Sequence, residues 1–210
     1  MSASFAAPEP RAGAAPRRVV VVAASTGGPA ALARLVGALP RPLGAAVLVA
    51  QHMPAGFTAT LAKRLHSIGR LPAGEATDGD VLETDRVYVA PGGSHLLVER
   101  DGAAVRLRLD HGPAVWGVRP AADLLFTSAA AIFGAGVVGV VLTGMGRDGA
   151  AGLRAVRDAG GHALVQDRAS SVVYGMPQAA MQLAGADREL ALGDVAGAIV
   201  DALVPLGSPR

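Results

Sequence analysis

The chain has 210 residues, of which 51% are hydrophobic and only 3% are aromatic. This length suits one large domain, whose core must be built mainly from Ala, Val and Leu. The formal net charge is +2 and the basic residues are scattered, so we expect no nucleic-acid-binding surface. The sequence contains no cysteine, which excludes disulfides and thiolate metal sites and fits a cytoplasmic protein.

The N-terminal segment differs in composition from the rest of the chain. Residues 1–16 are rich in Ala, Pro and Ser without any period, and we predict a flexible tail there. The apolar run within 17–24 is typical of a strand that is buried on both faces of a parallel sheet. Two arginines precede this run, but it is shorter than the ~7–15 apolar residues of a secretory signal.

The next segments alternate between helix and strand patterns. Apolar residues at helical spacing predict a helix over 29–39, and Pro29 suits its first turn. The apolar segment 45–50 predicts a second buried strand. A single apolar stripe then predicts a helix over 56–68.

The middle of the chain has a different pattern. An extended segment over 80–90 ends in Val-Tyr-Val and is followed by two short apolar runs, 95–99 and 105–109. The Asp-Gly dipeptide between these runs is a strong signal for a tight hairpin turn. We therefore predict an antiparallel hairpin beside an otherwise parallel sheet.

The remaining segments return to alternating patterns, which predict helices over 120–133, 149–159, 176–184 and 195–204 and strands over 137–142 and 162–166. The uncharged stretch 124–146 is long enough to span a bilayer, but a helix, a glycine turn and a strand explain it better. We predict no membrane insertion. The predicted fold is a three-layer α/β/α domain over 17–205 with a mostly parallel, doubly wound sheet.

Three segments carry reactive side chains at the ends of predicted strands. They are Ala-Ser-Thr-Gly-Gly-Pro at 24–29, Gln-His-Met-Pro at 51–54 and Leu-Thr-Gly-Met-Gly-Arg-Asp-Gly at 142–149. The carboxyl ends of parallel strands meet at one edge of a sheet. We therefore expect a hydroxyl, an imidazole and a carboxylate to come together there, although they lie far apart in the sequence.

Ser25 is a candidate nucleophile. The segment after it, Thr26 to Gly28, offers free backbone N–H groups at a helix N-terminus, and an oxyanion formed by attack on an ester needs such donors. Two other interpretations remain open at this point. The same pattern is typical of a phosphate-binding turn, and a serine at this position is a common helix N-cap.

His52 and Asp148 complete the candidate constellation. His52 leaves a buried strand and is placed to take a proton from a serine, although this segment alone favours a histidine satisfied by nearby backbone. Asp148 is placed to orient and stabilise that histidine, or else to cap the helix that follows it. An inward-facing carboxylate cannot easily do both for its own helix. No histidine pair has metal-ligand spacing, so we expect no metal.

The combination of these segments resembles the catalytic domain of the CheB-type methylesterases of bacterial chemotaxis receptors, from about residue 18 to residue 204. The segments that carry the resemblance occur in order: ASTGGP, QHMPAGFTATLAKRL, VYVAPGGSHL, VVLTGMGRDGAAGL and QDRASSVVYGMP. The resemblance implies hydrolysis of glutamyl methyl esters on receptor cytoplasmic helices, together with glutamine deamidation, without a cofactor. It implies that Ser25 is the nucleophile, His52 the base and Asp148 its orienting partner.

The resemblance also implies roles for the neighbouring residues. Thr26, Gly27, Met145 and Gly146 lie where the family places groups around the nucleophile and the oxyanion. Arg119 and Arg147 are candidates for contact with an acidic receptor surface, although exposed arginines are often simply solvated.

The chain departs from the family pattern in two places. Full-length members usually carry an N-terminal receiver domain, and only about 17 residues precede the first strand here, so we expect no attached receiver, and a separate receiver protein is a candidate partner. Val118 and Ala121 stand where similar proteins tend to have more polar residues, which affects substrate contacts and not the triad.

Two other classes of function compete with the esterase. A phosphate or nucleotide binder would use Ser25 to Gly28 at a helix N-terminus, but the lysine of a P-loop and the acidic residue of a dinucleotide site are missing. A catalytically silent receptor-binding or scaffold module is the second alternative. The presence of all three candidate triad residues argues against it.

Overall fold

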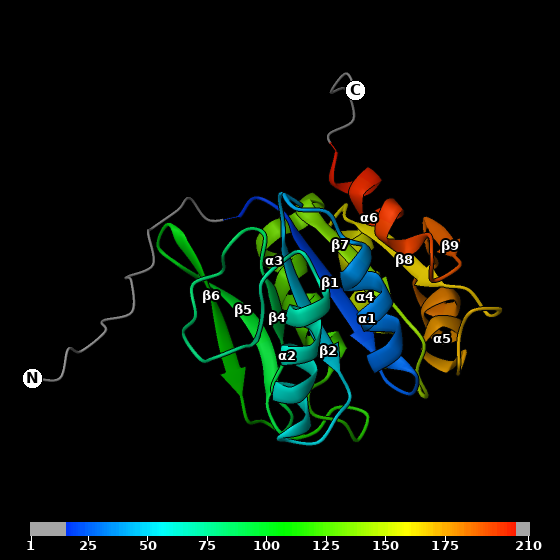
Figure 1. Cartoon of the computed structure of the whole chain (residues 1–210), viewed down its shortest axis with the longest axis horizontal. Helices are drawn as coiled ribbons and strands as arrows, with labels where there is room; N and C mark the ends of the chain where they lie inside the picture. The colour runs from blue at the N-terminus through cyan, green and yellow to red at the C-terminus, as the bar shows by residue number, and fades with distance from the viewer. Residues whose placement is uncertain (1–15, 205–210) are drawn as a thin grey trace, which may run out of the picture.

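The computed structural model describes residues 16–204. Apart from Pro16, the predicted flexible tail over 1–16 lies outside the described residues, as does residue 205 at the end of the predicted domain. The centre of the molecule is a seven-stranded sheet with the order β3-β4-β2-β1-β7-β8-β9, and all its paired strands are parallel (Figure 1). Its strands are β1 (Val19–Ala24), β2 (Ala46–Gln51), β3 (Ala73–Glu75), β4 (Val87–Val89), β7 (Val137–Val141), β8 (His162–Gln166) and β9 (Arg188–Leu190).

Helices cover both faces of this sheet, as the predicted three-layer α/β/α architecture requires. The helices α1 (Gly28–Ala38), α2 (Phe57–Ile68) and α6 (Val195–Leu203) pack on one face. The helices α3 (Ala122–Phe133), α4 (Ala150–Asp158) and α5 (Gly175–Leu183) pack on the other. A short 3-10 turn, η1 (Gly134–Gly136), separates α3 from β7. The uncharged stretch 124–146 is therefore divided by a glycine turn, as predicted, and does not form one long helix. No helix among residues 16–204 combines the length and the apolar composition needed to cross a membrane.

The β1 strand shows how the sequence produces this layering. Its six residues, VVVVAA, are all buried, and side chains of a strand point alternately to opposite faces. Val19, Val21 and Ala23 join the core under α3 and α4, whereas Val20, Val22 and Ala24 join the core under α1 and α2. An unbroken β-branched run is therefore what a central parallel strand needs, because both of its faces must be apolar.

The predicted antiparallel hairpin is present but does not extend the main sheet. β5 (His95–Asp101) and β6 (Ala104–Asp110) form a separate two-stranded sheet, joined by Gly102 and Ala103, and Arg106 of β6 also forms an isolated antiparallel bridge with Val81. Buried residues of the hairpin, among them Leu96 and Leu107, belong to the core on the α3 side. The hairpin thus covers part of that core instead of lengthening the sheet.

The two edge strands of the sheet were not predicted from the sequence. β3 has the sequence Ala-Gly-Glu and β9 has the sequence Arg-Glu-Leu, and each has only three residues. Neither has an apolar run or an alternation that would indicate a strand, because an edge strand needs burial on fewer sides. Pairing with the neighbouring strand determines their conformation.

The strand order reverses direction at β1. The chain passes from β1 to β2 on one side and returns to β7 on the other, with Val19 in register with both Ala46 and Val137. In doubly wound sheets, ligands bind outside the carboxyl ends of the strands at such a switch point. The turns that follow β1, β2 and β7 therefore lie where a functional site is expected.

Candidate active site

The ends of β1, β2 and β7 are tied together by backbone hydrogen bonds. The Ser25 N–H donates to the Thr143 carbonyl over 3.0 Å, which links the turn after β1 to the turn after β7. The His52 N–H donates to the Ala24 carbonyl over 3.0 Å, which links the turn after β2 to the end of β1. The sheet thus brings the backbones of the predicted nucleophile and base to neighbouring positions.

His52 and Asp148 form a direct hydrogen bond. His52 Nε2 donates to Asp148 Oδ2 over 2.7 Å, and the two side chains are 9% and 2% exposed. Water therefore has little access to either group, so that the interaction is stronger than a comparable pair on the surface. The partner of the His52 ring is a carboxylate, which is the arrangement expected of an oriented catalytic base and not of a histidine satisfied by nearby backbone.

The Asp148 carboxylate accepts three further hydrogen bonds, all from backbone N–H groups. Oδ2 accepts from Ala122 over 2.6 Å, and Oδ1 accepts from Asp123 and from Gly149, each over 3.0 Å. Ala122 and Asp123 are the first two residues of α3. The carboxylate therefore lies at the N-terminus of α3, where free N–H groups and the helix dipole stabilise negative charge.

Asp148 does not cap the helix that follows it, which was one of the two interpretations considered, and its carboxylate instead caps α3. α4 begins at Ala150, and Asp148 makes no contact with its first-turn N–H groups beyond Gly149. Asp123 of α3 instead accepts from the Gly152 N–H through Oδ1 over 2.7 Å. The two carboxylates therefore cap each other's helices in a crossed arrangement, and Asp148 remains free to contact His52.

Ser25 lies beside this pair but is not bonded to it. Among residues 16–204, no hydrogen bond joins Ser25 Oγ to His52. Because Nε2 of His52 is engaged with Asp148, Nδ1 is the ring nitrogen left to face a serine. Gly144 packs directly against Ser25, and a Cβ atom at Gly144 would lie 2.8 Å from Ser25 Cβ. Only glycine therefore fits at position 144.

Backbone donors without a partner lie in the turns next to Ser25, but the Gly28 N–H, which was also expected to be free, donates to the Ser25 carbonyl over 2.8 Å. The N–H groups of Thr26, Gly27, Met145 and Gly146 donate no hydrogen bond within the described part of the chain. Gly27 and Gly146 have positive φ values of 82° and 97°, in the left-handed region that favours glycine. These four donors belong to the two turns that meet at Ser25, so they offer an anion-binding environment next to the hydroxyl.

Two buried glutamines support the site, and sequence reasoning missed both. Gln51, the last residue of β2, donates through Nε2 to the carbonyls of Ser25 and His52, each over 3.0 Å. Gln166, the last residue of β8, accepts from the Thr143 N–H over 2.8 Å and donates to the Ser170 carbonyl over 2.8 Å. The sequence signal that could have identified them is a polar residue at the end of an apolar strand. In the structure, the neutral amide at this position bonds to the neighbouring turns.

Trp116, Arg119 and Arg147 lie in the two loops that lead into α3 and α4. Trp116 Nε1 donates to Asp123 Oδ2 over 2.8 Å, and the Arg147 guanidinium lies 4.7 Å from the centre of the Trp116 ring. Arg119 instead donates to the carbonyls of His111 and Gly112 within its own segment. Of the two arginines, Arg147 is therefore the one without a carbonyl or carboxylate partner among the described residues. Among residues 16–204, no group of three or more His, Cys, Asp or Glu side chains is placed to hold a metal ion.

Comparison with known proteins identifies similar chains. Residues 20–199 match the family model described as CheB methylesterase. A protein-glutamate methylesterase/protein-glutamine glutaminase of Symbiobacterium thermophilum is 46% identical over 188 residues, which is 90% of this chain and 51% of that protein. The protein of the same name from Pyrococcus abyssi is 43% identical over 187 residues, covering 89% of this chain and 51% of its own length. The chain thus spans about half the length of these curated relatives.

A solved structure matches the fold over nearly its whole length. The crystal structure of the Thermotoga maritima CheB methylesterase catalytic domain has a TM-score of 0.86 and 37% sequence identity to this chain. The match covers 88% of this chain and 97% of that one.

Proposed function

The chain belongs to the CheB methylesterase family, and from this premise we propose that it hydrolyses γ-glutamyl methyl esters on the cytoplasmic helices of methyl-accepting chemoreceptors. The same site would deamidate receptor glutamines, since relatives are named for both activities. The observation that carries the proposal is the buried His52–Asp148 hydrogen bond at the switch point, with Ser25 on the neighbouring strand end.

The proposed reaction assigns one role to each group. Ser25 Oγ attacks the ester carbonyl carbon while His52 Nδ1 takes its proton, and Nε2–H remains bonded to Asp148. The charge on the resulting imidazolium is balanced by the Asp148 carboxylate, which α3 holds in place. His52 then gives the proton to the leaving methoxide, so that methanol departs and an acyl-enzyme remains. Water, activated by His52, hydrolyses the acyl-enzyme to glutamate and free Ser25.

The oxyanion would be held by backbone donors. The N–H groups of Thr26, Gly27, Met145 and Gly146 belong to the two turns that meet at Ser25 and donate no hydrogen bond within the described residues. In a measured case, one such donor contributed about 3–4 kcal/mol of transition-state stabilisation. The reaction needs no cofactor or metal in this scheme, because the nucleophile, the base and the oxyanion donors are all groups of the chain.

The proposed partners follow from the same premise. We propose that the substrate is the cytoplasmic part of a chemoreceptor, that the protein acts in the cytoplasm and that a receiver protein regulates its activity. Arg147, stacked on Trp116, is the side chain we propose for contact with acidic residues of the receptor.

The direct test is the release of methanol from radiomethylated receptor cytoplasmic fragments. Ser25→Ala should abolish release without unfolding the domain, and a serine-directed phosphonate should label the unchanged protein only. Ser67→Ala is a matched control, because its hydroxyl lies on an exposed turn of α2 and donates to the Arg64 carbonyl. Turnover that persists in Ser25→Ala would remove Ser25 from the mechanism. Stabilisation by nucleotides without phosphonate labelling would favour the phosphate-binding alternative instead.

A further inference from the structure

A second buried histidine lies close to the site, and the proposed reaction does not use it. His95 is the first residue of β5 and is fully buried. Its Nε2 lies 3.0 Å from the Pro113 carbonyl oxygen, and its Nδ1 lies 3.0 Å from the Ala121 backbone nitrogen. A carbonyl only accepts and a backbone N–H only donates. The two partners therefore fix the neutral tautomer of His95, with the proton on Nε2 and an acceptor at Nδ1.

The hydrogen bond at His95 Nδ1 adjoins the hydrogen bonds that hold the Asp148 carboxylate. The N–H of Ala121 donates to His95 Nδ1, the N–H of Ala122 donates to Asp148 Oδ2 and the N–H of Asp123 donates to Asp148 Oδ1. Three consecutive N–H groups at the start of α3 are thus divided between these two side chains. Consecutive peptide planes are joined through the φ and ψ angles of one residue, so a shift of the Ala121 peptide displaces the next two N–H groups unless these angles compensate.

The donor of His95 holds the other end of the same segment. Residues 113–121 leave β6 and return to α3, and His95 bonds to the carbonyl of the first and to the N–H of the last. Between these ends, Val115 and Val118 form an isolated bridge around a tight turn that carries Trp116. The Trp116 indole then bonds to the side chain of Asp123, whose own backbone N–H donates to Asp148.

We propose that His95 is a positioning residue for catalysis, which sets the geometry of the His52–Asp148 pair by holding the Ala121 N–H at the start of α3. This proposal rests on the proposed esterase function for its kinetic consequences. The bond at Nδ1 carries the effect on Asp148, whereas the bond at Nε2 mainly fastens the distant end of the segment at Pro113. The two bonds therefore have separable consequences.

Two substitutions separate these bonds. In His95→Asn the amide oxygen can occupy the place of Nδ1 and accept from Ala121, but the side chain is too short to reach Pro113. In His95→Gln the amide nitrogen can occupy the place of Nε2 and donate to Pro113, but the Ala121 N–H loses its acceptor. Each variant loses one buried hydrogen bond, so a purely structural role predicts similar losses of stability and of activity in both.

The positioning role predicts unequal kinetics at similar stability. We expect His95→Gln to lower kcat about tenfold or more, because small displacements of catalytic groups have large effects on rate, while KM stays within about twofold. We expect His95→Asn to retain most of the kcat. His111→Asn is a control of the same chemistry in the connection between β6 and α3, since His111 is exposed and, within residues 16–204, its ring bonds to Ser94 Oγ alone. It should leave kcat unchanged.

A second measurement does not depend on turnover. Amide hydrogen exchange at Ala122 and Asp123 should speed up in His95→Gln and stay close to the unchanged protein in His95→Asn. Equal kcat in the two variants, or rates that follow thermal stability alone, would overturn the proposal. If the unchanged protein released no methanol, the esterase function would fail, and the exchange comparison would still decide whether His95 holds the start of α3.

Discussion

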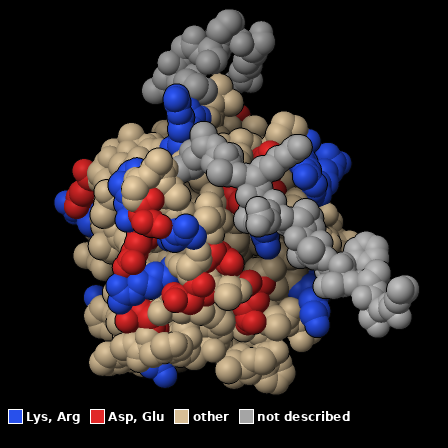
Figure 2. Space-filling view, turned by 90° about the vertical axis from the view of Figure 1, so that its left-hand side faces the viewer, with Lys and Arg blue, Asp and Glu red and all other residues tan. Residues whose placement is uncertain are grey.

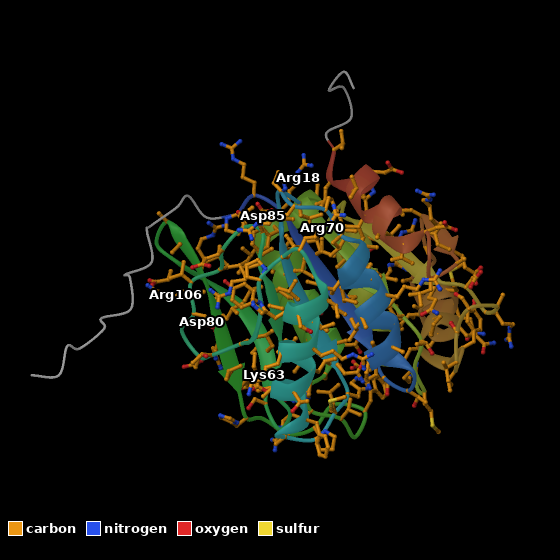
Figure 3. The ribbon with its side chains drawn as sticks, in the orientation of Figure 1. Arg18, Lys63, Arg70, Asp80, Asp85 and Arg106 are labelled. Carbon is orange, nitrogen blue, oxygen red and sulfur yellow. The ribbon has the colours of Figure 1, made fainter. Side chains whose placement is uncertain are left out.

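Polar side chains at the carboxyl edge of the central sheet and those on the outer face of the β5–β6 hairpin are used in opposite ways. At the sheet edge, Gln51, Asp148 and Gln166 are at most 2% exposed, and their partners include backbone groups of neighbouring turns. On the hairpin, Arg106 pairs with Asp101 and Arg108 with Glu99, each over 2.6 Å, and all four side chains are 42–65% exposed. Figure 2 shows such charges of both signs interspersed on this side of the molecule, and Figure 3 labels Arg106 there.

The two regions differ in the energetic cost of losing one partner of a hydrogen bond or ion pair. A buried backbone group that loses its partner has no water to replace it, and the cost is about 1–3 kcal/mol for each group. An exposed charge that loses its partner is hydrated at once, so exposed pairs contribute about 0–1 kcal/mol. Shorter distances on the hairpin therefore do not make its ion pairs more important than the longer contacts at the sheet edge.

The largest effect is expected for Asp148→Asn. The amide has the shape of the carboxylate but cannot accept at both oxygens, so one of its backbone donors or His52 loses its acceptor. By analogy with the corresponding change in a serine protease, we expect the rate to fall about 10⁴-fold. The free energy of unfolding should also fall by about 1–3 kcal/mol. Methanol release and urea unfolding measure the two effects, and a full rate in the folded variant would contradict the proposed role.

The two buried glutamines provide a matched pair for the next test. Gln51→Leu and Gln166→Leu each remove two or more bonds to neighbouring turns, and each should lower the free energy of unfolding by about 1–3 kcal/mol. Only Gln51 holds the carbonyls of both Ser25 and His52. We therefore expect Gln51→Leu to lose far more kcat than Gln166→Leu at comparable stability. Equal kinetic losses would show that the contact with the two catalytic backbones has no special importance.

The Tyr174 side chain is partly buried, and its exposure lies between that of the sheet-edge residues and that of the hairpin residues. Burial, together with a hydrogen bond to Glu189, raises the pKa of the Tyr174 phenol from 10.0 to about 12. The folded state then holds this proton at a pH where the unfolded chain has lost it. Its contribution to stability is therefore complete below pH 10 and disappears as the pH rises towards about 12. Tyr174→Phe should flatten the stability curve in this window in urea unfolding experiments, and an unchanged slope would exclude the linkage.

The smallest effect is expected on the hairpin. Glu99→Gln removes one of the two carboxylate partners of Arg108, and the guanidinium keeps Asp110 and its contact with water. We expect the melting temperature to change by less than about 2 °C, because exposed pairs contribute little. Differential scanning calorimetry would detect a larger shift, which would erase the contrast between the hairpin and the sheet edge.

The sequence was sufficient where local pattern and tertiary environment agree. The buried runs of β1, β2, β7 and β8 predicted the parallel sheet, and the polar residues after them predicted the edge at which Ser25, His52 and Asp148 lie. The pairing of His52 with Asp148 could be expected because parallel strands end at the same edge.

Other features depended on contacts that no local pattern encodes. β3 and β9 are strands only because a neighbour pairs with them, and the hairpin could not be assigned to its own sheet without knowing what it covers. The bonds of Gln51, His95 and Gln166 join segments up to 26 positions apart. A lone glutamine or histidine at a strand end has no spacing that reveals such a partner.

The crossed capping of α3 and α4 has a consequence for how this domain could lose its proposed activity during evolution. Asp148 is needed to complete α3 whether or not any ester is cleaved, and Asp123 does the same for α4. Selection on folding alone would retain this carboxylate in a pseudoenzyme descended from the domain. The hydroxyl of Ser25 makes no hydrogen bond within the described chain, so position 25 is where an inactive descendant would first diverge.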